Sequence, residues 1–234
     1  MNELLKADIV LMAAGKGERM GHSRNKIFLE IGGVPIYRLT FDAVKASGLF
    51  RRIVVAASEA DLDDLRKCLA DDILIFCKGG ATRAASVRNA LEVLQREGSE
   101  SLVFVHDMVR PFITSDFLNS LAVAAQRDGA AAPAVSPVET VRYECEGRLS
   151  RLDRAKIHLM QTPQVFHSRF IRECFLDADS RQHDLTDEMC YLERRGINFT
   201  IVPGLAENIK ITSREDLLKA EIILKNRQEK IDET

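Results

Sequence analysis

The sequence of 234 residues contains no long apolar run. None of its apolar stretches approaches the roughly 18 residues that a membrane-spanning helix needs. Near the N-terminus, Asp8 interrupts the segment where a signal peptide would have an unbroken apolar core. These absences argue against a membrane protein and an exported protein, and they lead us to expect a cytoplasmic location.

The sequence also lacks an excess of charge of either sign. Lysine and arginine together number 33, against 35 aspartates and glutamates, so the formal net charge is −2. Such a balance provides no general attraction to nucleic acids or to membrane surfaces. We therefore expect neither as a partner, although basic residues can still cluster locally.

Paired cysteines and patterned histidines are absent as well. The five cysteines are widely spaced and include no Cys-x-x-Cys pair, which argues against a disulfide scaffold and against structural zinc. The five histidines show no spacing typical of a metal site or a proton relay. The chemistry must therefore rest on other side chains.

The most informative segment that is present runs from Ala7 to Lys26, ADIVLMAAGKGERMGHSRNK. Residues 9–12 have the pattern of a buried strand, and the loop after it is rich in glycine (Gly15, Gly17) and in cations. An open α/β sheet binds nucleotides at such a place. Two known phosphate loops do not fit, because Gly17 stands where a Walker loop needs Ser or Thr and Met20 stands where a dinucleotide loop needs glycine. A glycine-rich turn with solvated charges is the alternative.

Further along the chain, short apolar strands alternate with amphipathic helices, which predicts an α/β fold with a Rossmann-like, mostly parallel sheet flanked by helices. No linker divides the chain, so we expect a single domain over residues 1–234. The strands are expected at 9–12, 53–57, 73–77, 102–105, 130–135, 199–202 and 209–211. The helices are expected at 35–48, 58–69, 87–94, 114–129, 170–175 and 188–195, and from Ser213 onward.

The alternation stops between residues 138 and 159. This segment has the pattern of two extended pieces around Glu146-Gly147, a hairpin turn signal. A lone hairpin is only marginally stable in water, so we expect it to pack as an arm against a second subunit.

Six segments along the chain share the order of the motifs of one known family. The segments are AAGKGERM with Lys26, GGATRAASV (79–87), VHDMVRPF (105–112), LDRAKIHLMQTPQVF (152–166), LTDE (185–188) and ENIKIT (207–212). Together they resemble 2-C-methyl-D-erythritol 4-phosphate cytidylyltransferase of the non-mevalonate isoprenoid pathway, within the cytidylyltransferase and sugar-nucleotide pyrophosphorylase superfamily. The resemblance covers nearly the whole chain.

The resemblance implies that the protein transfers CMP from CTP to 2-C-methyl-D-erythritol 4-phosphate and releases pyrophosphate. It also implies Mg²⁺ as cofactor and a homodimer joined through the arm at 138–159. Two alternatives stay open. One is a related enzyme that uses ribitol 5-phosphate or another alditol phosphate as acceptor. The other is a nucleotide-binding protein that has lost catalysis.

The resemblance also assigns residues to three roles. The catalytic cations would be Lys26, Arg19 and Lys210. The nucleotide would be bound by Ala13, Ala14, Gly15, Gly17, Gly80, Ala81, Arg83, Ser86 and Asp107. The acceptor would be held by Arg110, Thr140, Arg154, Thr162, Thr186 and Lys210, with Thr140 and Arg154 reaching the site of the partner subunit.

Ordinary structural roles remain open for several of these residues. Arg19 and Lys26 could be solvated surface cations, and Ser86 could cap a helix that begins at Val87. Asp107 follows a strand, where it could bind a hydroxyl group or help to place Mg²⁺, or simply pair with Arg110. Arg154 could pair with Asp153. We expect His106, on the opposite face of its strand from Asp107, to be structural.

The main departure from the family pattern lies at the catalytic lysine. The family usually has Pro-Lys-Gln, whereas this chain has Asn25-Lys26-Ile27. Without a proline, φ before Lys26 is not fixed, so we expect the lysine to be less well placed in the empty site.

Overall fold

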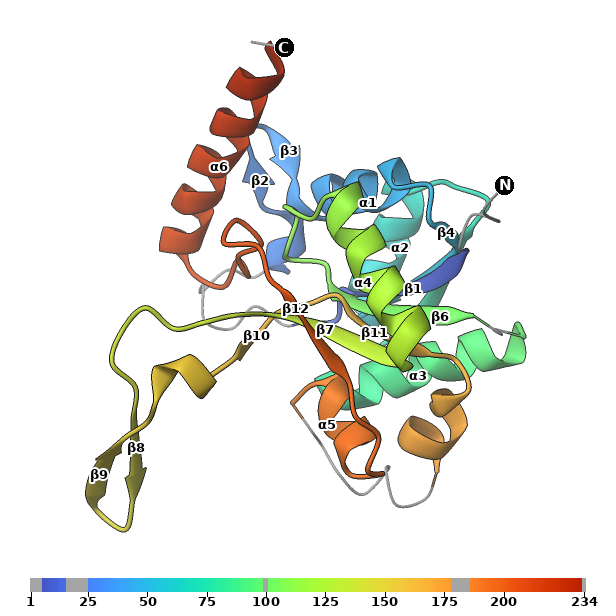
Figure 1. Ribbon diagram of the computed structural model, residues 1–234. Helices are drawn as coiled ribbons and strands as arrows, with labels where there is room; N and C mark the ends of the chain where they lie inside the picture. Colours follow the sequence, from blue (N-terminus) through green and yellow to red (C-terminus); the bar gives the residue numbers. More distant parts are fainter. Residues whose placement is uncertain (1–5, 16–24, 99–100, 178–185, 233–234) are drawn as a thin grey trace.

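A computed structural model describes residues 6–15, 25–98, 101–177 and 186–232 (Figure 1). Eight strands form one mixed sheet, and the fold is of the α/β class as expected. The strands are β1 (Ala7–Met12), β4 (Phe50–Ala57), β5 (Leu74–Lys78), β6 (Leu102–Asp107), β7 (Ala130–Val135), β10 (Leu159–Met160), β11 (Gln164–His167) and β12 (Thr200–Pro203).

The order of the strands places a crossover beside β1. The sheet runs β10-β7-β11-β6-β1-β4-β5, with β12 paired to β7. Strand β1 lies between β4 and β6 and is parallel to both. The chain therefore moves outward from β1 through β4 to β5 and then returns to the other side of β1. Ligands of open α/β sheets bind at the carboxyl ends of the strands where the order reverses in this way.

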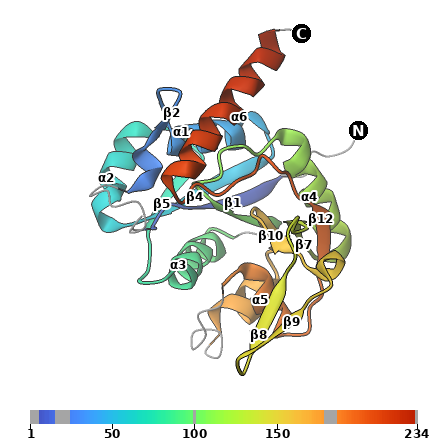
Figure 2. The ribbon, with the colours of Figure 1, turned by 90° about the vertical axis from the view of Figure 1, so that its left-hand side faces the viewer.

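Helices cover both faces of this sheet (Figures 1 and 2). Helices α1, α2 and α4 pack on one face, and α3, η4 and α5 on the other. The helices are α1 (Ile36–Ala46), α2 (Glu59–Cys68), α3 (Arg83–Arg96), α4 (Ser115–Asp128), α5 (Glu188–Glu193), α6 (Arg214–Asp232), the 3₁₀-helices η2 (Lys26–Phe28) and η3 (Arg154–Lys156) and the π-helix η4 (Ile171–Leu176).

Because both faces are covered, the middle parts of the central strands are apolar on both sides. In β1, Ile9 and Leu11 belong to one core, while Val10 and Met12 belong to the other. Two of the expected helix boundaries are confirmed by their hydrogen bonds. The Thr114 hydroxyl accepts from the Phe117 N–H at the start of α4. At the start of α6, Ser213 and Asp216 each accept from the other's N–H.

The elements differ from the expectations in four places. Strand β11 was not predicted, although it pairs antiparallel with both β6 and β7. Residues 209–211 were predicted as a strand but form a loop, which is joined to the body by a hydrogen bond from the Ile211 N–H to the Val109 carbonyl. Helix α3 begins four residues before the predicted Val87, because Thr82 rather than Ser86 caps it. The two-residue strands β2 (Glu30–Ile31) and β3 (Val34–Pro35) were also not foreseen.

The expected hairpin is confirmed as β8 (Arg142–Cys145) and β9 (Arg148–Arg151), which project from the body (Figure 1). Glu146 (φ 50°) and Gly147 (φ 74°) form the connecting turn, and positive φ at both positions is the geometry that joins twisted strands in two residues. Every residue of the two strands is exposed. The hairpin therefore has no core of its own.

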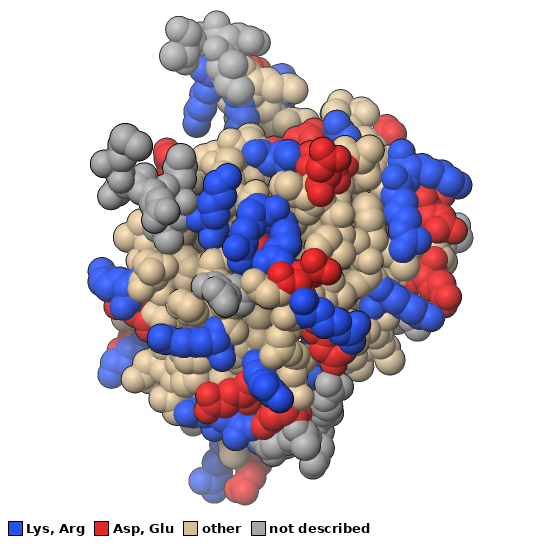
Figure 3. Space-filling model, turned by 90° about the vertical axis from the view of Figure 1, so that its right-hand side faces the viewer, with Lys and Arg blue, Asp and Glu red and all other residues tan. Residues whose placement is uncertain are grey.

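The described surface carries charges of both signs. On the face shown in Figure 3, acidic and basic side chains lie next to one another at several places. Within the described residues, none of the helices has the length and the apolar character that crossing a membrane requires.

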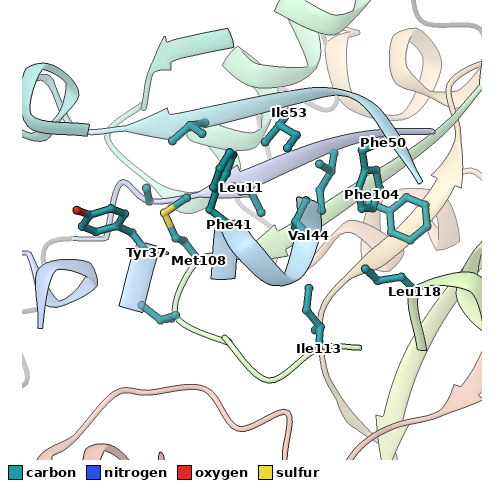
Figure 4. Packing of buried hydrophobic residues seen from close by; sticks show 14 of the residues in the cluster. Leu11, Tyr37, Phe41, Val44, Phe50, Ile53, Phe104, Met108, Ile113 and Leu118 are labelled. Carbon is teal, nitrogen blue, oxygen red and sulfur yellow. The ribbon is translucent and has the colours of Figure 1, made fainter. Parts of the chain in front are cut away.

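The larger core lies between β1, β4, β6 and the helices α1 and α4 (Figure 4). Phe104 is fully buried in this core, and its ring meets that of Phe50 edge to face at 5.1 Å between centroids. Strand β6 carries Phe104 in the core and ends at Asp107, so the core fixes the position of that carboxylate.

Replacing Phe104 with alanine should lower the free energy of unfolding by roughly 3–5 kcal/mol, because a cavity would replace a buried ring. Urea denaturation measures this loss. The control is Val123→Ala on α4, where the side chain is 59% exposed and the expected loss is below about 0.5 kcal/mol. Similar losses in both variants would contradict the assigned core.

Candidate active site

A cavity of about 470 Å³ opens at the carboxyl ends of β1 and β6, within the usual size range of ligand sites. Both glycine-containing segments reach it, one directly after β1 and the other directly after β5. Its lining residues are Met12, Ala13, Ala14, Gly15, Asn25, Lys26, Ile27, Gly80, Ala81, Thr82, Arg83, Ser86, Asp107, Val109, Lys210 and Thr212.

Most of the residues predicted for the nucleotide and for catalysis meet at this cavity. Gly17 and Arg19 lie outside the described residues. Several lining residues were not predicted, among them Thr82 and Thr212. Thr82 is the cap of α3, and Thr212 lies two residues after Lys210. Both belong to segments that carry the family resemblance, GGATRAASV and ENIKIT, so the sequence contained a reason to include them.

The loop between β5 and α3 lines the cavity and is held in shape by a side chain of the helix that follows it. The Ser86 hydroxyl accepts from the Gly80 N–H at 2.9 Å and lies 2.9 Å from the Thr82 carbonyl, to which it donates. A Cβ atom on Gly80 would lie 2.4 Å from the Cβ of Ala85, so the loop requires glycine at this position. Ser86 therefore fixes the loop from within α3 and does not cap the helix.

Asp107 lies at the end of β6 with three cationic side chains around its carboxylate. The Lys210 ammonium is 2.8 Å from Oδ2, Arg83 is 3.4 Å from Oδ1 and Arg110 is 3.6 Å from Oδ2. Burial alone would raise the pKa of the Asp107 carboxyl, but Arg83 and Lys210 hold that pKa well below its ordinary value. The carboxylate is therefore ionised and joins three segments of the chain.

Arg83 is held in turn by Glu188, the first residue of α5. The two guanidinium NH groups lie 2.6 and 3.3 Å from the carboxylate oxygens of Glu188, whose side chain is buried. Burial raises the pKa of Glu188, while Arg83 opposes this shift. The Gln164 side chain on β11 accepts from the N–H groups of Glu188 and Met189 and so fixes the start of α5. Sequence reasoning missed Glu188, although it lies in the LTDE motif.

A second chain of hydrogen bonds supports Asp107 from behind the cavity. The Asp107 N–H donates to the Thr162 hydroxyl, which lies 3.0 Å from His106 Nδ1, and His106 Nε2 lies 3.0 Å from the Arg110 carbonyl. Because a carbonyl only accepts, Nε2 carries the proton and Nδ1 accepts from Thr162. His106 is thus structural, as expected. Thr162 is buried and does not line the cavity.

The loop that carries Lys210 is tied to the sheet by buried amides. Gln161 exchanges hydrogen bonds with both backbone groups of Leu205, and Asn208 donates to the Thr162 carbonyl at 2.8 Å. The Arg110 guanidinium donates to the Asn208 carbonyl at 2.7 Å. Arg110 is therefore mostly buried behind Lys210 and holds the loop in place.

The sequence profile of the family described as IspD, 2-C-methyl-D-erythritol 4-phosphate cytidylyltransferase, matches residues 7–226. The chain belongs to this family. The enzyme of that name from Syntrophus aciditrophicus is 35% identical over 233 residues, covering 97% of this chain and 99% of the relative.

Solved structures give the same assignment of fold. The 4-diphosphocytidyl-2C-methyl-D-erythritol synthase from Anaerococcus prevotii is 25% identical with a TM-score of 0.81, covering 94% of this chain and 98% of that one. The 2-C-methyl-D-erythritol 4-phosphate cytidylyltransferase from Thermus thermophilus is 30% identical with a TM-score of 0.73, covering 92% and 97%.

The remaining residues that the family resemblance assigned to the acceptor lie away from the cavity of this cytidylyltransferase-family chain. Thr140 and Arg154 lie on or beside the projecting hairpin and are exposed. Arg154 donates to the Val138 carbonyl, while Asp153 accepts from the Ala155 N–H instead of pairing with the arginine. Thr186 is exposed and its hydroxyl lies 3.9 Å from the Cys190 sulfur.

Burial lowers the pKa of His106 to about 4, against about 6.5 in an unfolded chain. Below pH 6.5 the His106 imidazole is therefore protonated in the unfolded chain but stays neutral in the folded protein. The free energy of unfolding decreases as the pH falls. We expect His106 to contribute a loss of roughly 2 kcal/mol between pH 7 and pH 5. Urea denaturation at several pH values measures it.

The His106→Gln variant should show a flatter dependence over the same range, because it removes the titrating group. The matched control is His158→Gln, since His158 is exposed and should leave the slope unchanged. An unchanged slope in His106→Gln would show that His106 is not the group responsible.

Proposed function

We propose that the protein transfers CMP from CTP to 2-C-methyl-D-erythritol 4-phosphate, giving 4-diphosphocytidyl-2-C-methyl-D-erythritol and pyrophosphate. The observation that carries the proposal is the meeting of Lys26, Lys210 and the Gly80 loop at one cavity, in a chain that matches the family over residues 7–226. The five cysteines, all described and none in a disulfide, suit a reducing compartment, which supports a cytoplasmic location.

In this reaction an oxygen of the acceptor phosphate attacks the α-phosphorus of CTP. A new phosphorus–oxygen bond forms while the bond to the β-phosphate oxygen breaks, and pyrophosphate leaves. The second pKa of a phosphate monoester is about 6, so the attacking group is already mostly a dianion at neutral pH and needs no general base. The protein's task is to position the groups and to neutralise charge.

The residues of the cavity divide this task between them. Lys26 and Lys210 both line the cavity and stabilise the negative charge that accumulates at the α-phosphate. Backbone groups of Gly80 and Ala81 read the edge of the cytosine. Asp107 holds Lys210 in place and accepts from a hydroxyl group of the substrate. Arg19, outside the described residues, completes the cationic set.

Mg²⁺ is the cofactor we propose, carried mainly by the triphosphate. Among the described residues no group of three or more His, Cys, Asp or Glu side chains is arranged to hold a metal ion. Asp107 provides one carboxylate at the cavity, which fits a metal that keeps most of its ligands from phosphate and water. When bound, the ion withdraws charge from the phosphates.

The acceptor half of the site is completed, in our proposal, by a second copy of the chain. The arm and the residues beside it expose large apolar side chains, with Val138 79%, Leu149 62% and Tyr143 56% exposed. Exposed apolar side chains on a projecting hairpin favour burial against a partner. Thr140 and Arg154 would then enter the partner's site, and the homodimer would be the active form.

Phosphorus NMR of the purified protein with CTP and Mg²⁺ tests the reaction and the acceptor together. With 2-C-methyl-D-erythritol 4-phosphate we expect a new diphosphate diester signal and released pyrophosphate, and with ribitol 5-phosphate we expect neither. Product in the ribitol tube alone would identify the related alditol-phosphate enzyme. CTP binding without turnover on either acceptor would favour a nucleotide-binding protein without catalysis.

Mixed dimers of Lys26→Ala and Arg154→Ala test the shared site. Each variant alone should be nearly inactive, because every site lacks one of the two cations. A dimer of one copy of each has one intact site and one doubly altered site, so it should recover about half of the wild-type rate. Separately tagged copies, co-expressed and purified as the mixed dimer, provide the sample. No recovery would argue that each subunit is self-contained.

A further inference from the structure

Asn25 is a nearly buried polar residue directly before Lys26, and both hydrogens and the oxygen of its side-chain amide make hydrogen bonds. It is 8% exposed. Nδ2 donates to the Ala13 carbonyl at 2.8 Å and to Asp61 Oδ2 at 2.9 Å, while Oδ1 accepts from the Ile27 N–H at 3.3 Å. An asparagine amide has two donor hydrogens, and both are used here.

These bonds join three separate elements at the rim of the cavity. Ala13 directly follows β1, and its own N–H donates to the Ala56 carbonyl of β4 at 2.8 Å. Asp61 lies in the first turn of α2, where Ser58 donates to the same carboxylate oxygen at 2.6 Å. Ile27 belongs to η2. Asn25 therefore fastens the start of η2 to the sheet and to a helix.

The other side of Lys26 is held by an apolar contact. Ile27 is 1% exposed and belongs to the larger core. The backbone of Lys26 is thus fixed from both sides, by polar bonds at residue 25 and by burial at residue 27. Asn25 has φ −57° and ψ 133°, values that proline also adopts. The side-chain hydrogen bonds hold the backbone where a proline ring would hold it covalently.

We propose that Asn25 is the positioning residue for Lys26, and that its contact with Asp61 supplies part of that effect. Without a proline before it, Lys26 was expected to be less well placed. In this proposal the hydrogen bonds of Asn25 constrain its backbone instead. The proposal rests on the proposed function for the role of Lys26 at the α-phosphate. Reactive groups misplaced by about 1 Å lose on the order of 100-fold in rate, so the position of the ammonium is decisive.

Asn25→Ala should reduce kcat by roughly 10- to 100-fold while the KM for CTP changes by less than about threefold, because positioning is needed mainly in the transition state. Asn25→Pro should recover kcat to within about threefold of wild type, since the ring restores φ. The matched control is Asn89→Ala, which removes one hydrogen bond to the Lys78 carbonyl outside the cavity. An unchanged kcat in Asn25→Ala, or no recovery in a folded Asn25→Pro, would overturn the proposal.

Asp61→Ala provides a second variant if a change at Asn25 prevents folding, which circular dichroism and thermal melting reveal. It should lower kcat by roughly 3- to 10-fold, and its effect should not add to that of Asn25→Ala, because both act through one contact. Additive losses would show that Asp61 acts independently and would contradict the proposed route.

A readout without turnover separates this proposal from the proposed function. Lysines methylated with ¹³C give NMR signals, and the Lys26 signal is identified by its absence in Lys26→Arg. In Asn25→Ala this signal should shift and broaden, whereas in Asn89→Ala it should not. A shifted Lys26 signal in a protein that makes no product would support the positioning role and refute the proposed reaction. An unshifted signal would overturn the positioning role, whatever the activity.

Discussion

The buried carboxylate of Asp107 is the constraint on which the rest of the site depends. A carboxylate taken out of water is costly unless charges and hydrogen bonds compensate it, and here three cationic side chains do so. Each cation comes from a different segment: Arg83 from the start of α3, Arg110 from the loop after β6 and Lys210 from the loop before α6. A single charge at the end of β6 thereby fixes the relative positions of three segments.

Those cations are themselves held by groups further from the cavity. Glu188 forms a two-bond ion pair with Arg83, and the Gln164 side chain fixes the start of the helix that carries Glu188. The Asn208 carbonyl accepts from Arg110, and the Asn208 amide is bonded to the backbone of Thr162. Because every support is buried and hydrogen-bonded, the removal of any one leaves a polar group without its partner, which costs about 1–3 kcal/mol.

The sequence predicts much of this fold because its signals are local. The apolar run at β1, the cap at Thr114 and the hairpin turn at Glu146 each depend on a few neighbouring residues. Strand β11 escaped prediction because its four residues are identified only by pairing with β6 and β7, both far away in the chain. The loop at 209–211 has the apolar alternation of a strand, but it is joined to the body by the bond from the Ile211 N–H to the Val109 carbonyl and not by pairing with a strand.

In the site, too, features set by neighbouring residues were predicted, and features set by residues far apart in the chain were not. Glycine loops and isolated cations can be recognised from the sequence alone, and the family resemblance assigned most of the residues that meet at the cavity. Glu188 was missed because its importance comes from Arg83, 105 residues away. Asn25 was interpreted as a loss of constraint because the sequence shows the missing proline, whereas Asp61, 36 residues further on, supplies the hydrogen bond that takes its place.

The charges around the cavity also explain why a carboxylate suits a site for anionic substrates. Lys26, Lys210, Arg83 and Arg110 carry four positive charges, against two negative charges on Asp107 and Glu188. Without the carboxylates, four cations at close quarters would repel one another and lose their fixed positions. With them, the cluster stays ordered and still has a net positive charge of two. A triphosphate that enters therefore meets cations already in place, which keeps the cost of reorganisation during the reaction low.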